Sequence, residues 1–338
     1  MIKVIATFLV LGMMMAGPSL GKASAAEGES QTISIGKQKG LSYLPLIIAE
    51  KQSLIEKQAK NLGLADLKVQ WVSLASAVAL TDAVLSGQVN YVAGASPVLN
   101  ILWDKTNKDV KGVVNLGNFD YQLNAARPSI KSVKDFTESD RIAVSGVKLS
   151  VHAILLQIAA SDAFGEDKWD SLDKLTVSMP HPTAYTALTS GSTEITAHLT
   201  TPPFQDMELD DPRIHKVWSA SDILGGGGVA TILFAKSETY AQYPIADKAI
   251  VAAVVEAMEF IKANPDKAAA ISNEIEKSPL PDDRLAKIIA SPANEYSIAP
   301  RNVLKFAQFQ NKVGTLKNRP ESWRDLFFSD YPDSPDGN

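Results

Sequence analysis

Cysteine is absent from this sequence of 338 residues. Without cysteine the chain can form no disulfide bond and offers neither a thiol nucleophile nor a thiolate ligand for a metal ion. The absence also removes the residue to which a lipid anchor is attached in exported proteins that stay at a cell surface. The hydrophobic core alone must stabilise the fold, and a chain of this length can bury enough apolar surface to do so.

Blocks of like charge are missing as well. The chain has 33 Lys and Arg against 38 Asp and Glu, a net charge of −5, and both signs are scattered along it. It has neither a basic stripe for nucleic acid nor a polybasic run for anionic lipid, so neither partner is expected. Hydrophobic residues make up 45% and charged residues 21%, which is typical of a globular protein of one to three domains.

No run of apolar residues reaches the roughly 20 that are needed to span a bilayer. The N-terminal run at 4–15 follows Lys3 and stops before a Gly-Pro pair, and the small residues Ala-Ser-Ala stand at 23–25. These features are typical of an export signal with its cleavage site. We therefore expect residues 1–25 to be a cleaved signal peptide rather than a membrane anchor. The mature chain, without a lipid anchor, is expected in the periplasm.

The sequence signals of common enzyme and metal sites are also missing. The four histidines, His152, His181, His198 and His215, include no pair at the i, i+4 spacing that places two ligands on one helix face, so no metal or other cofactor is predicted. The glycine run 225–228 is not followed by Lys-Ser or Lys-Thr, and neither a GxGxxG nor a GxSxG motif is present. We predict no enzymatic activity, and a hinge or a close backbone approach for the glycine run.

Strands and helices alternate along the first third of the chain. Apolar patterns predict strands at 31–35, 67–74, 89–93 and 110–116, with an amphipathic helix at 77–85. A Ser-Gly pair follows this helix, and Gly-Ala-Ser-Pro follows the third strand, where turns are expected. Strands that alternate with helices form parallel α/β sheets.

The same order then recurs. Strands are predicted at 141–145, 175–179 and 193–199, a loop at 181–183 and a helix at 185–189. In both units a helix, a Ser-Gly turn and a strand lead to a hydroxyl residue followed by proline. We therefore predict two α/β lobes of similar build, although two unrelated α/β units would share part of this pattern.

We expect the first lobe to consist of two separate segments of the chain and the second lobe of one. After the second unit the chain is mainly helical, beginning with a long amphipathic helix and continuing as a C-terminal helical block. If this block returns to the first lobe, that lobe consists of residues 31–118 and 222–328, and the second lobe of 119–221. The two crossovers, near 115–122 and 216–228, would then form the hinge.

Several segments carry a resemblance to a known fold family. They are IGKQKGLSYLPL at 35–46, LTDAVLSGQVNYVAGASP at 80–97, AVSGVKLSVHA at 143–153, TALTSGSTEITAHLTTPPF at 186–204 and the helical tail ANPDKAAAISNEIEKS at 263–278. In this order and spacing the chain resembles the periplasmic binding protein type II fold, and within it the nitrate-, taurine- and alkanesulfonate-binding proteins. The resemblance covers most of residues 31–328.

This resemblance implies a two-lobed α/β protein in which each lobe is a mixed sheet flanked by helices. It implies a monomeric solute-binding protein of an ABC importer, which holds a small molecule between its lobes and delivers it to the membrane permease with its ATPase. A sulfonate- or nitrate-like anion is among the candidate ligands. The same fold includes a pyrimidine-precursor synthase, and an enzyme of that kind is the alternative. That enzyme relies on a Cys-rich segment and iron, and this chain has no cysteine.

Ligands of open α/β sheets bind beyond the carboxyl ends of the strands, where loops lead into helices. In both units these positions are rich in small and hydroxyl residues, and the free N–H groups at helix starts favour an anion there. The predicted ligand-binding residues of the first lobe are Gln38, Leu41, Ser42, Tyr43, Ala75, Ser76, Ser96 and Pro97. Those of the second lobe are Ser145, Gly146, Lys148, Ser150, His181, Thr200 and Thr201.

Several of these residues have a second interpretation. Any single serine or threonine among them can be a helix cap instead. Lys148 is the best placed cation for an anionic ligand, although a loop lysine is more often solvated, and Tyr43 offers a flat face and one hydroxyl. We expect His152 in the core, and His198 either in the core or at the pocket. No arginine is among the predicted positions, so a bidentate clamp on a dianion is not expected.

Overall fold

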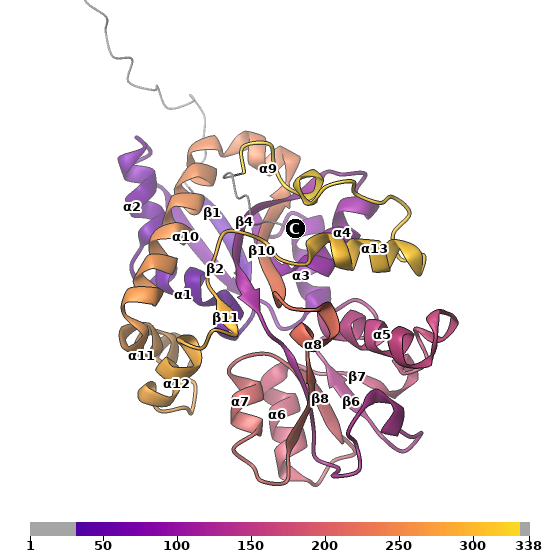
Figure 1. Ribbon diagram of the computed structural model, residues 1–338. Coiled ribbons are helices and arrows are strands. Elements are labelled where there is room, and N and C mark those ends of the chain that lie inside the picture. Colours follow the sequence, from indigo (N-terminus) through magenta and orange to yellow (C-terminus); the bar gives the residue numbers. More distant parts are fainter. Residues whose placement is uncertain (1–31, 332–338) are drawn as a thin grey trace, which may run out of the picture.

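The computed structural model describes residues 32–331, and the expected signal peptide at 1–25 lies outside them. Two β-sheets, each flanked by helices, form an upper and a lower lobe (Figure 1). The first sheet has, in order, the strands β11 (Asn294–Glu295), β4 (Val110–Phe119), β10 (Val229–Lys236), β3 (Tyr91–Ala95), β1 (Thr32–Lys37) and β2 (Lys68–Ser73). The second sheet has β7 (Thr176–Ser178), β6 (Ile142–Val144), β8 (Ala197–Thr200), β5 (Gln122–Ala125) and β9 (His215–Ser219).

The two sheets are built alike. In the first, β1 pairs in parallel with β2 and β3, and β10 runs antiparallel between β3 and β4. In the second, β6 pairs in parallel with β7 and β8, and β5 runs antiparallel between β8 and β9. Each antiparallel strand is the one that enters its sheet after the chain has crossed from the other lobe. The predicted fold class, two similar lobes with mixed sheets, is confirmed.

Helices cover both faces of the first sheet (Figure 1). One face carries α1 (Leu44–Lys51), α2 (Leu54–Asn61) and α10 (Pro244–Ala263), with α11 (Pro265–Glu276) and α12 (Asp282–Ile289) continuing from them. The other face carries α3 (Ala77–Leu85), α4 (Ser96–Lys105) and α13 (Val303–Lys312), and α9 (Ser237–Gln242) follows β10. The second lobe contains α5 (Val151–Phe164), α6 (His181–Ser190), α7 (Phe204–Glu208) and α8 (Ala220–Leu224). Short 3-10 helices are η1 (Leu41–Tyr43), η2 (Val133–Asp135), η3 (Glu166–Lys168), η4 (Asp173–Leu175) and η5 (Trp323–Leu326).

Side chains alternate along the central strands of the first sheet and belong in turn to two hydrophobic cores, one on each face of the sheet. Tyr91 and Ala93 pack into the core beneath α1 and α10, whereas Val92 between them packs into the core beneath α3 and α4. In the neighbouring β10, Leu233 belongs to the first core and Phe234 to the second. Successive side chains of a strand point to opposite faces, so a strand buried on both faces supplies both cores.

The structure corrects two predictions of secondary structure and adds one strand. The predicted loop at 181–183 is the first turn of α6, because Pro182 is tolerated at a helix start, where no N–H partner is required. The predicted strand at 193–199 begins only at Ala197, since the Thr193 hydroxyl bonds Ala187 and the Ile195 amide in a turn. The strand β5 was not predicted, because its four residues are too few for a clear alternation.

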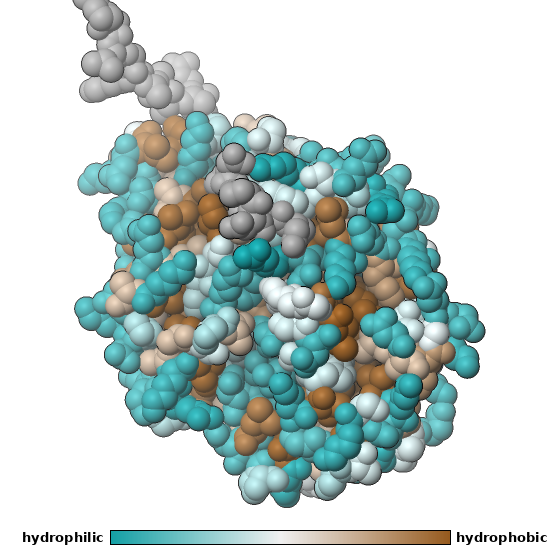
Figure 2. Space-filling view, in the orientation of Figure 1, coloured by the Kyte–Doolittle hydropathy of each residue, from teal (hydrophilic) through white to brown (hydrophobic). Residues whose placement is uncertain are grey.

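The outer surface of the described chain is mainly polar. Figure 2 shows a face dominated by hydrophilic side chains, with hydrophobic residues visible in scattered groups. Between residues 32 and 331, no helix combines the length and the hydrophobicity that crossing a bilayer requires. The large apolar side chains are concentrated in the interiors of the two lobes.

Candidate functional site

A small cavity lies between the two lobes, where loops from both sheets meet. From the first lobe it is lined by Gln38, Lys39, Ser42, Tyr43, Ala77, Leu80, Ala95 and Val98, and from the connection between the lobes and the second lobe by Tyr121, Ser145, Ser150, Val151, His152, His181 and Thr201. Its free volume is about 30 Å³. An adjoining opening of about 240 Å³ is lined by Gln38, Lys39, Ser73, Leu74, Ala75, Pro180, His181 and Pro182. We call the first space the interlobe cavity and the second its entrance.

Many of the predicted ligand-binding residues meet at these two spaces. Gln38, Ser42, Tyr43, Ser145, Ser150, His181 and Thr201 line the interlobe cavity, and Ala75 lines its entrance. They follow β1, β2, β6, β7 and β8, so the strand ends of both sheets converge as parallel α/β topology predicts. The structure thus brings together residues from the predicted set that are more than 150 positions apart, such as Ser42 and Thr201, whose hydroxyl oxygens lie 3.3 Å from each other.

The other predicted residues lie beside the cavity rather than on its wall. In the first lobe, the Leu41 side chain is in the core, Ser76 caps α3 by accepting from the Ala79 amide, and Ser96 and Pro97 begin α4. In the second lobe, Gly146 accepts from the Ser150 hydroxyl through its carbonyl, Thr200 is buried on β8, and Lys148 has a positive φ in the loop before α5. The capping interpretation therefore holds for Ser76 and also for Ser150, which accepts from the Ala153 amide while lining the cavity.

Tyr121 and His152 line the cavity although neither was predicted to do so. Tyr121 lies in the crossover between β4 and β5, and its ring stacks on that of His152 with centroids 5.1 Å apart. Its hydroxyl is 3.1 Å from the Ser42 hydroxyl and 3.4 Å from that of Thr231. The one available signal was the crossover itself, because a residue at a hinge between two lobes faces the space that they enclose.

Three histidines and a glutamate form a buried series next to this cavity. Nδ1 of His198 lies 2.5 Å from Oε1 of Glu208, and Nε2 of His198 lies 2.9 Å from Nδ1 of His181. The His181 ring meets the His152 ring edge to face, with centroids 4.7 Å apart, and Nδ1 of His152 is 2.8 Å from the Ser145 hydroxyl. His198 is therefore a core residue that reaches the cavity through His181. Within residues 32–331, no group of three or more His, Cys, Asp or Glu side chains is arranged to hold a metal ion.

Burial controls the ionisation of the side chains that face the cavity. It lowers the pKa of His152 to about 3. Burial likewise lowers the pKa of His181 well below its usual value, and it raises the pKa of the Tyr43 and Tyr121 hydroxyls. At neutral pH all four side chains are uncharged and present only hydrogen-bonding groups and ring faces.

The lysines near the entrance already have partners in the protein. Lys37 forms an ion pair with Glu50 at 3.0 Å, and the Lys39 ammonium donates to the backbone oxygen of Glu276. The Glu276 carboxylate in turn accepts from the Gly40 amide at 3.0 Å, at the start of η1. The Gly40 amide is therefore paired with a carboxylate of the protein itself.

No protein-family model matches the sequence, and no curated protein matches it either. Solved structures do. The alkanesulfonate-binding protein SsuA from Xanthomonas axonopodis pv. citri, bound to MOPS, superposes with a TM-score of 0.68 at 16% identity over 87% of this chain and 96% of that one. The periplasmic nitrate-binding protein NrtA from Synechocystis gives 0.66 at 14% identity, over 88% and 85%. A Candida albicans protein with the generic periplasmic binding protein structural fold gives 0.65 at 12% identity, over 88% and 96%.

This chain has the periplasmic binding protein fold. At these identities the likeness is one of fold, and function must be argued from the site itself.

The two lobes of this periplasmic binding protein fold are in direct contact around the cavity. The Arg284 guanidinium on α12 pairs with Asp210 of the second lobe at 2.7 Å. Lys312 at the end of α13 pairs with Glu166 of the second lobe. These contacts and the small cavity volume describe a closed arrangement of the lobes.

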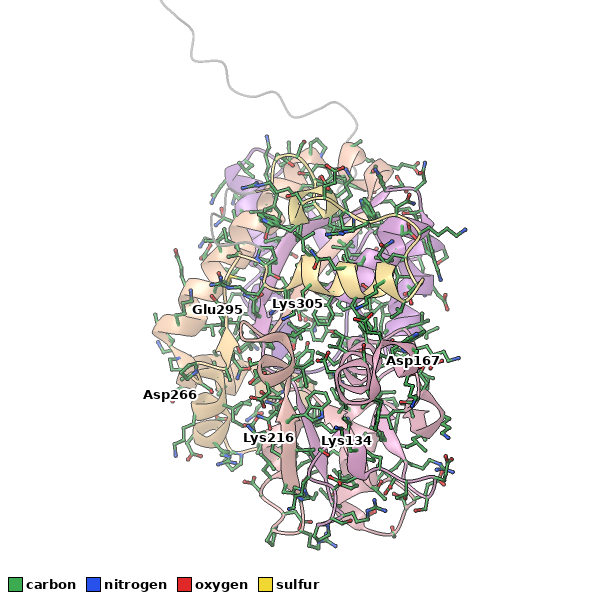
Figure 3. The ribbon with its side chains drawn as sticks, turned by 45° about the vertical axis from the view of Figure 1, so that its right-hand side comes forward. Lys134, Asp167, Lys216, Asp266, Glu295 and Lys305 are labelled. Atoms are coloured by element: carbon green, nitrogen blue, oxygen red, sulfur yellow. The ribbon has the colours of Figure 1, made fainter. Side chains whose placement is uncertain are left out.

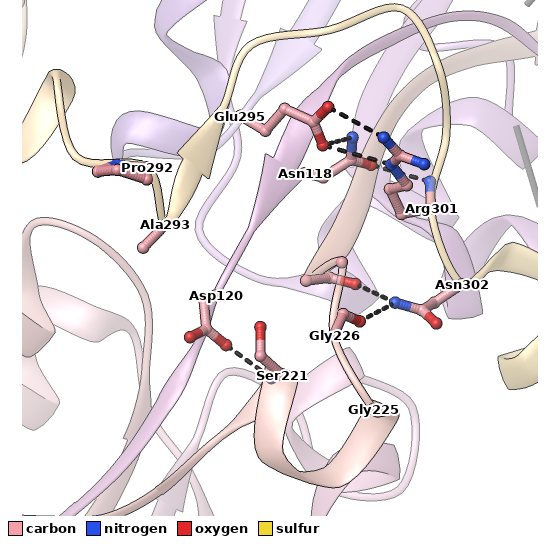
Figure 4. A pocket seen from close by; sticks show the side chains of 12 residues that line it. Asn118, Asp120, Ser221, Gly225, Gly226, Pro292, Ala293, Glu295, Arg301 and Asn302 are labelled. Carbon is pink, nitrogen blue, oxygen red and sulfur yellow. Dashed lines mark hydrogen bonds and ion pairs between the residues drawn. The ribbon is translucent and has the colours of Figure 1, made fainter. Parts of the chain in front are cut away.

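A larger cleft of about 520 Å³ lies beside the connections between the lobes and shares no lining residue with the interlobe cavity. Its polar side chains are paired with one another: Asn118 and Arg301 donate to the Glu295 carboxylate, and Asn302 donates to the carbonyls of Gly226 and Gly228 (Figure 4). The glycine run 225–228 therefore lines this larger cleft and not the interlobe cavity. Lys305 lies at the level where the lobes meet (Figure 3), and its ammonium donates to the carbonyl of Leu224.

Proposed function

We propose that this protein is the solute-binding component of an ABC importer, which captures a small ligand between its lobes in the periplasm and delivers it to a membrane permease. The observation that carries the proposal is the interlobe cavity, whose polar groups come from both lobes and face one enclosed space. Ligand contacts made to both lobes at once favour the closed arrangement over the open one. The moving lobes would be residues 31–118 with 222–328, and residues 119–221.

The size of the cavity supports an opening motion. A free volume of about 30 Å³ accommodates about one water molecule. Even a small organic solute needs more room than this, so it can enter only if the lobes separate or if it also occupies the entrance of about 240 Å³. A protein that must open to admit its ligand is suited to capturing the ligand and releasing it again.

The ligand is proposed to be a small anion, sulfonate- or nitrate-like. Solved proteins of the same fold bind an alkanesulfonate and nitrate. The cavity wall offers hydroxyl groups of Ser42, Ser145 and Thr201 and two imidazole rings, which can hold oxygen atoms by hydrogen bonds without a direct salt bridge. The predicted ligand-binding residues that line the cavity are proposed to make these contacts.

The first experiment is native mass spectrometry of the purified protein, followed by thermal unfolding with methanesulfonate, taurine, nitrate, acetate and a neutral pyrimidine. Because a ligand that binds only the folded state adds stability, the true class should raise Tm. The Ala77→Leu variant fills the cavity wall and should abolish the shift, whereas Val78→Leu, at an exposed position of the same helix, should retain it. No shift with any compound and no co-purified molecule would refute the proposal.

The same experiment addresses an enzyme on this fold. A solute-binding protein returns its ligand unchanged, so the mass of the recovered compound should be that of the compound added. A new product mass after incubation would identify turnover and replace the transport function by a catalytic one.

A further inference from the structure

A buried row of hydrogen-bonding groups runs through the second lobe to the interlobe cavity. It begins at Glu208 on α7, continues through His198 on β8 and ends at His181 on α6, which lines the cavity and its entrance. The side chains of Glu208 and His198 have no exposed surface at all. These two residues therefore contact no ligand themselves, and any effect they have on a ligand passes through His181.

The Glu208 carboxyl group is surrounded by donors. Its Oε2 accepts from the Asn124 side-chain amide at 3.0 Å, and its Oε1 lies 2.5 Å from Nδ1 of His198. In the described chain His198 is its one ion-pair partner. A buried carboxylate persists only when it is hydrogen-bonded and its charge is balanced. Since imidazole is more basic than a carboxylate, the proton of this contact belongs on the ring nitrogen.

The contact between His198 and His181 determines in which direction the hydrogen bonds of this row run. Nε2 of His198 and Nδ1 of His181 lie 2.9 Å apart, so one of these two nitrogens carries a proton and donates it to the other. If His198 carries both of its protons, its Nε2–H donates to Nδ1 of His181. A neutral His181 must then hold its own proton on Nε2, the ring nitrogen for which no described residue is a hydrogen-bond partner. If His198 is neutral instead, with its proton on Nδ1 toward Glu208, its Nε2 accepts from Nδ1–H of His181, and Nε2 of His181 is a bare acceptor.

We propose that Glu208 and His198 form a buried carboxylate–imidazolium pair that fixes His181 as a hydrogen-bond donor, with its Nε2–H presented to the interlobe cavity. In this arrangement Glu208 and His198 are positioning residues, and His181 determines specificity for a ligand with an acceptor atom, such as a sulfonate or nitrate oxygen. The positive charge of His198 lies one residue behind the wall, which stabilises an anion in a cavity whose own rings are neutral. The statement about the ligand rests on the proposed function, whereas the proton arrangement does not.

The surrounding charges agree with this assignment. In the described chain, the titratable groups around His198 are Glu208 on α7, His181 on α6 and His152 on α5. Both neighbouring rings are buried, and burial is the main cause that lowers the pKa of each. The His152 and His181 rings are therefore neutral at pH 7, and the Glu208 carboxyl group contacts His198. Nε2 of His152 is buried without a hydrogen-bond partner in the described chain, so the cavity wall offers a second imidazole nitrogen beside His181.

The test is ¹⁵N NMR of the histidine side chains in the ligand-free protein at pH 7. The chain has only four histidines. The His215→Gln variant removes the ring that bonds the backbone of Ile130, and the signals of the remaining three are then assigned by single substitutions. We expect an imidazolium at His198 and a neutral Nε2–H tautomer at His181. In Glu208→Gln, His198 should become neutral. A neutral His198, or a His181 without a proton on Nε2, in the wild-type protein would overturn the proposal.

Binding is measured separately by calorimetry with methanesulfonate, and with dimethyl sulfone as a neutral molecule of similar shape. Wild-type protein should prefer the anion, and Glu208→Gln should weaken its binding by at least about tenfold, which corresponds to about 1.4 kcal/mol. Equal affinity of the two proteins for methanesulfonate would contradict the role of the pair. If no compound of the wider panel binds at all, the proposed function fails, while the NMR result still decides the proton arrangement.

Discussion

The backbone amide of Leu41 donates a hydrogen bond to the carbonyl oxygen of Pro202, with an N···O distance of 3.1 Å. Leu41 follows β1 of the first sheet and Pro202 follows β8 of the second, so this bond joins the carboxyl end of one strand in each lobe. The amide at the start of η1 therefore binds the protein's own backbone in the closed arrangement. A ligand that requires a wider cavity must either break this hydrogen bond or bind beside it.

Removing the ion pairs between the lobes should favour the open arrangement. The Arg284→Ala and Lys312→Ala changes break the pairs with Asp210 and Glu166. Each exposed pair contributes only about 0.5 kcal/mol, so the double variant should shift the ratio of open to closed protein by about fivefold. Small-angle scattering should show a larger radius of gyration for the ligand-free double variant. The Lys57→Ala change breaks a pair with Glu256 inside the first lobe and serves as the control, since it should leave the radius unchanged.

Tyr121→Phe should destabilise the protein by about 1 kcal/mol, the usual loss for a buried hydrogen bond. The hydroxyl lies within hydrogen-bonding distance of Ser42 and Thr231, and the stacking on His152 would be kept. The matched control is Tyr296→Phe, because the Tyr296 hydroxyl is equally buried but has no hydrogen-bond partner in the described chain. Urea unfolding should show a loss for the first variant and none for the second, and equal effects would argue against the Tyr121 network.

Stability should fall as the pH is lowered from about 6.5, and His152 should account for part of the slope. Burial lowers the pKa of His152 to about 3 in the folded protein, whereas the unfolded chain binds this proton near pH 6.5. Between these values the unfolded state binds more protons, so the free energy of unfolding decreases by up to about 1.4 kcal/mol per pH unit for this group. His181, whose pKa is lowered in the same direction, adds to the effect.

The measurement is urea unfolding at pH 7, 6 and 5 for the wild-type protein and His152→Gln. The glutamine variant should have a shallower dependence on pH, whatever its stability at pH 7. Parallel curves for the two proteins would show that His152 is not buried as a neutral ring.

Gly228→Ala should destabilise the protein more than Gly225→Ala. Both glycines have a left-handed φ, +64° and +73°, so alanine is strained by about 1 kcal/mol at either position. A Cβ at Gly228 would also lie 2.9 Å from the backbone of Phe119, where β4 ends, whereas at Gly225 the nearest atom is the Lys305 ammonium at 3.8 Å. We expect a loss of about 2 kcal/mol or more for Gly228→Ala in thermal or urea unfolding. Losses of equal size would show that the hinge backbone adapts freely.

Much of the architecture could be predicted from the sequence because it depends on local patterns. The helix Ala77–Leu85 and the strands β1, β2 and β4 lie close to their predicted positions, since apolar periodicity and Ser-Gly turns mark them. The convergence of Ser42, Ser145 and Thr201 was predictable for a related reason. In a parallel α/β sheet the carboxyl ends of the strands share one edge, whatever lies between them in the chain.

The row from Glu208 through His198 to His181 could not be read from the sequence. The three residues lie on α7, β8 and α6, and their spacing matches neither the period of a helix nor that of a strand, because only packing between elements brings them together. The volume of the cavity is likewise a property of how closely the two lobes approach. Local patterns in the sequence therefore account for the two similar lobes and for the small and hydroxyl residues at their strand ends. Which side chains meet there depends on packing between elements, since the chain order does not constrain the distances between these segments.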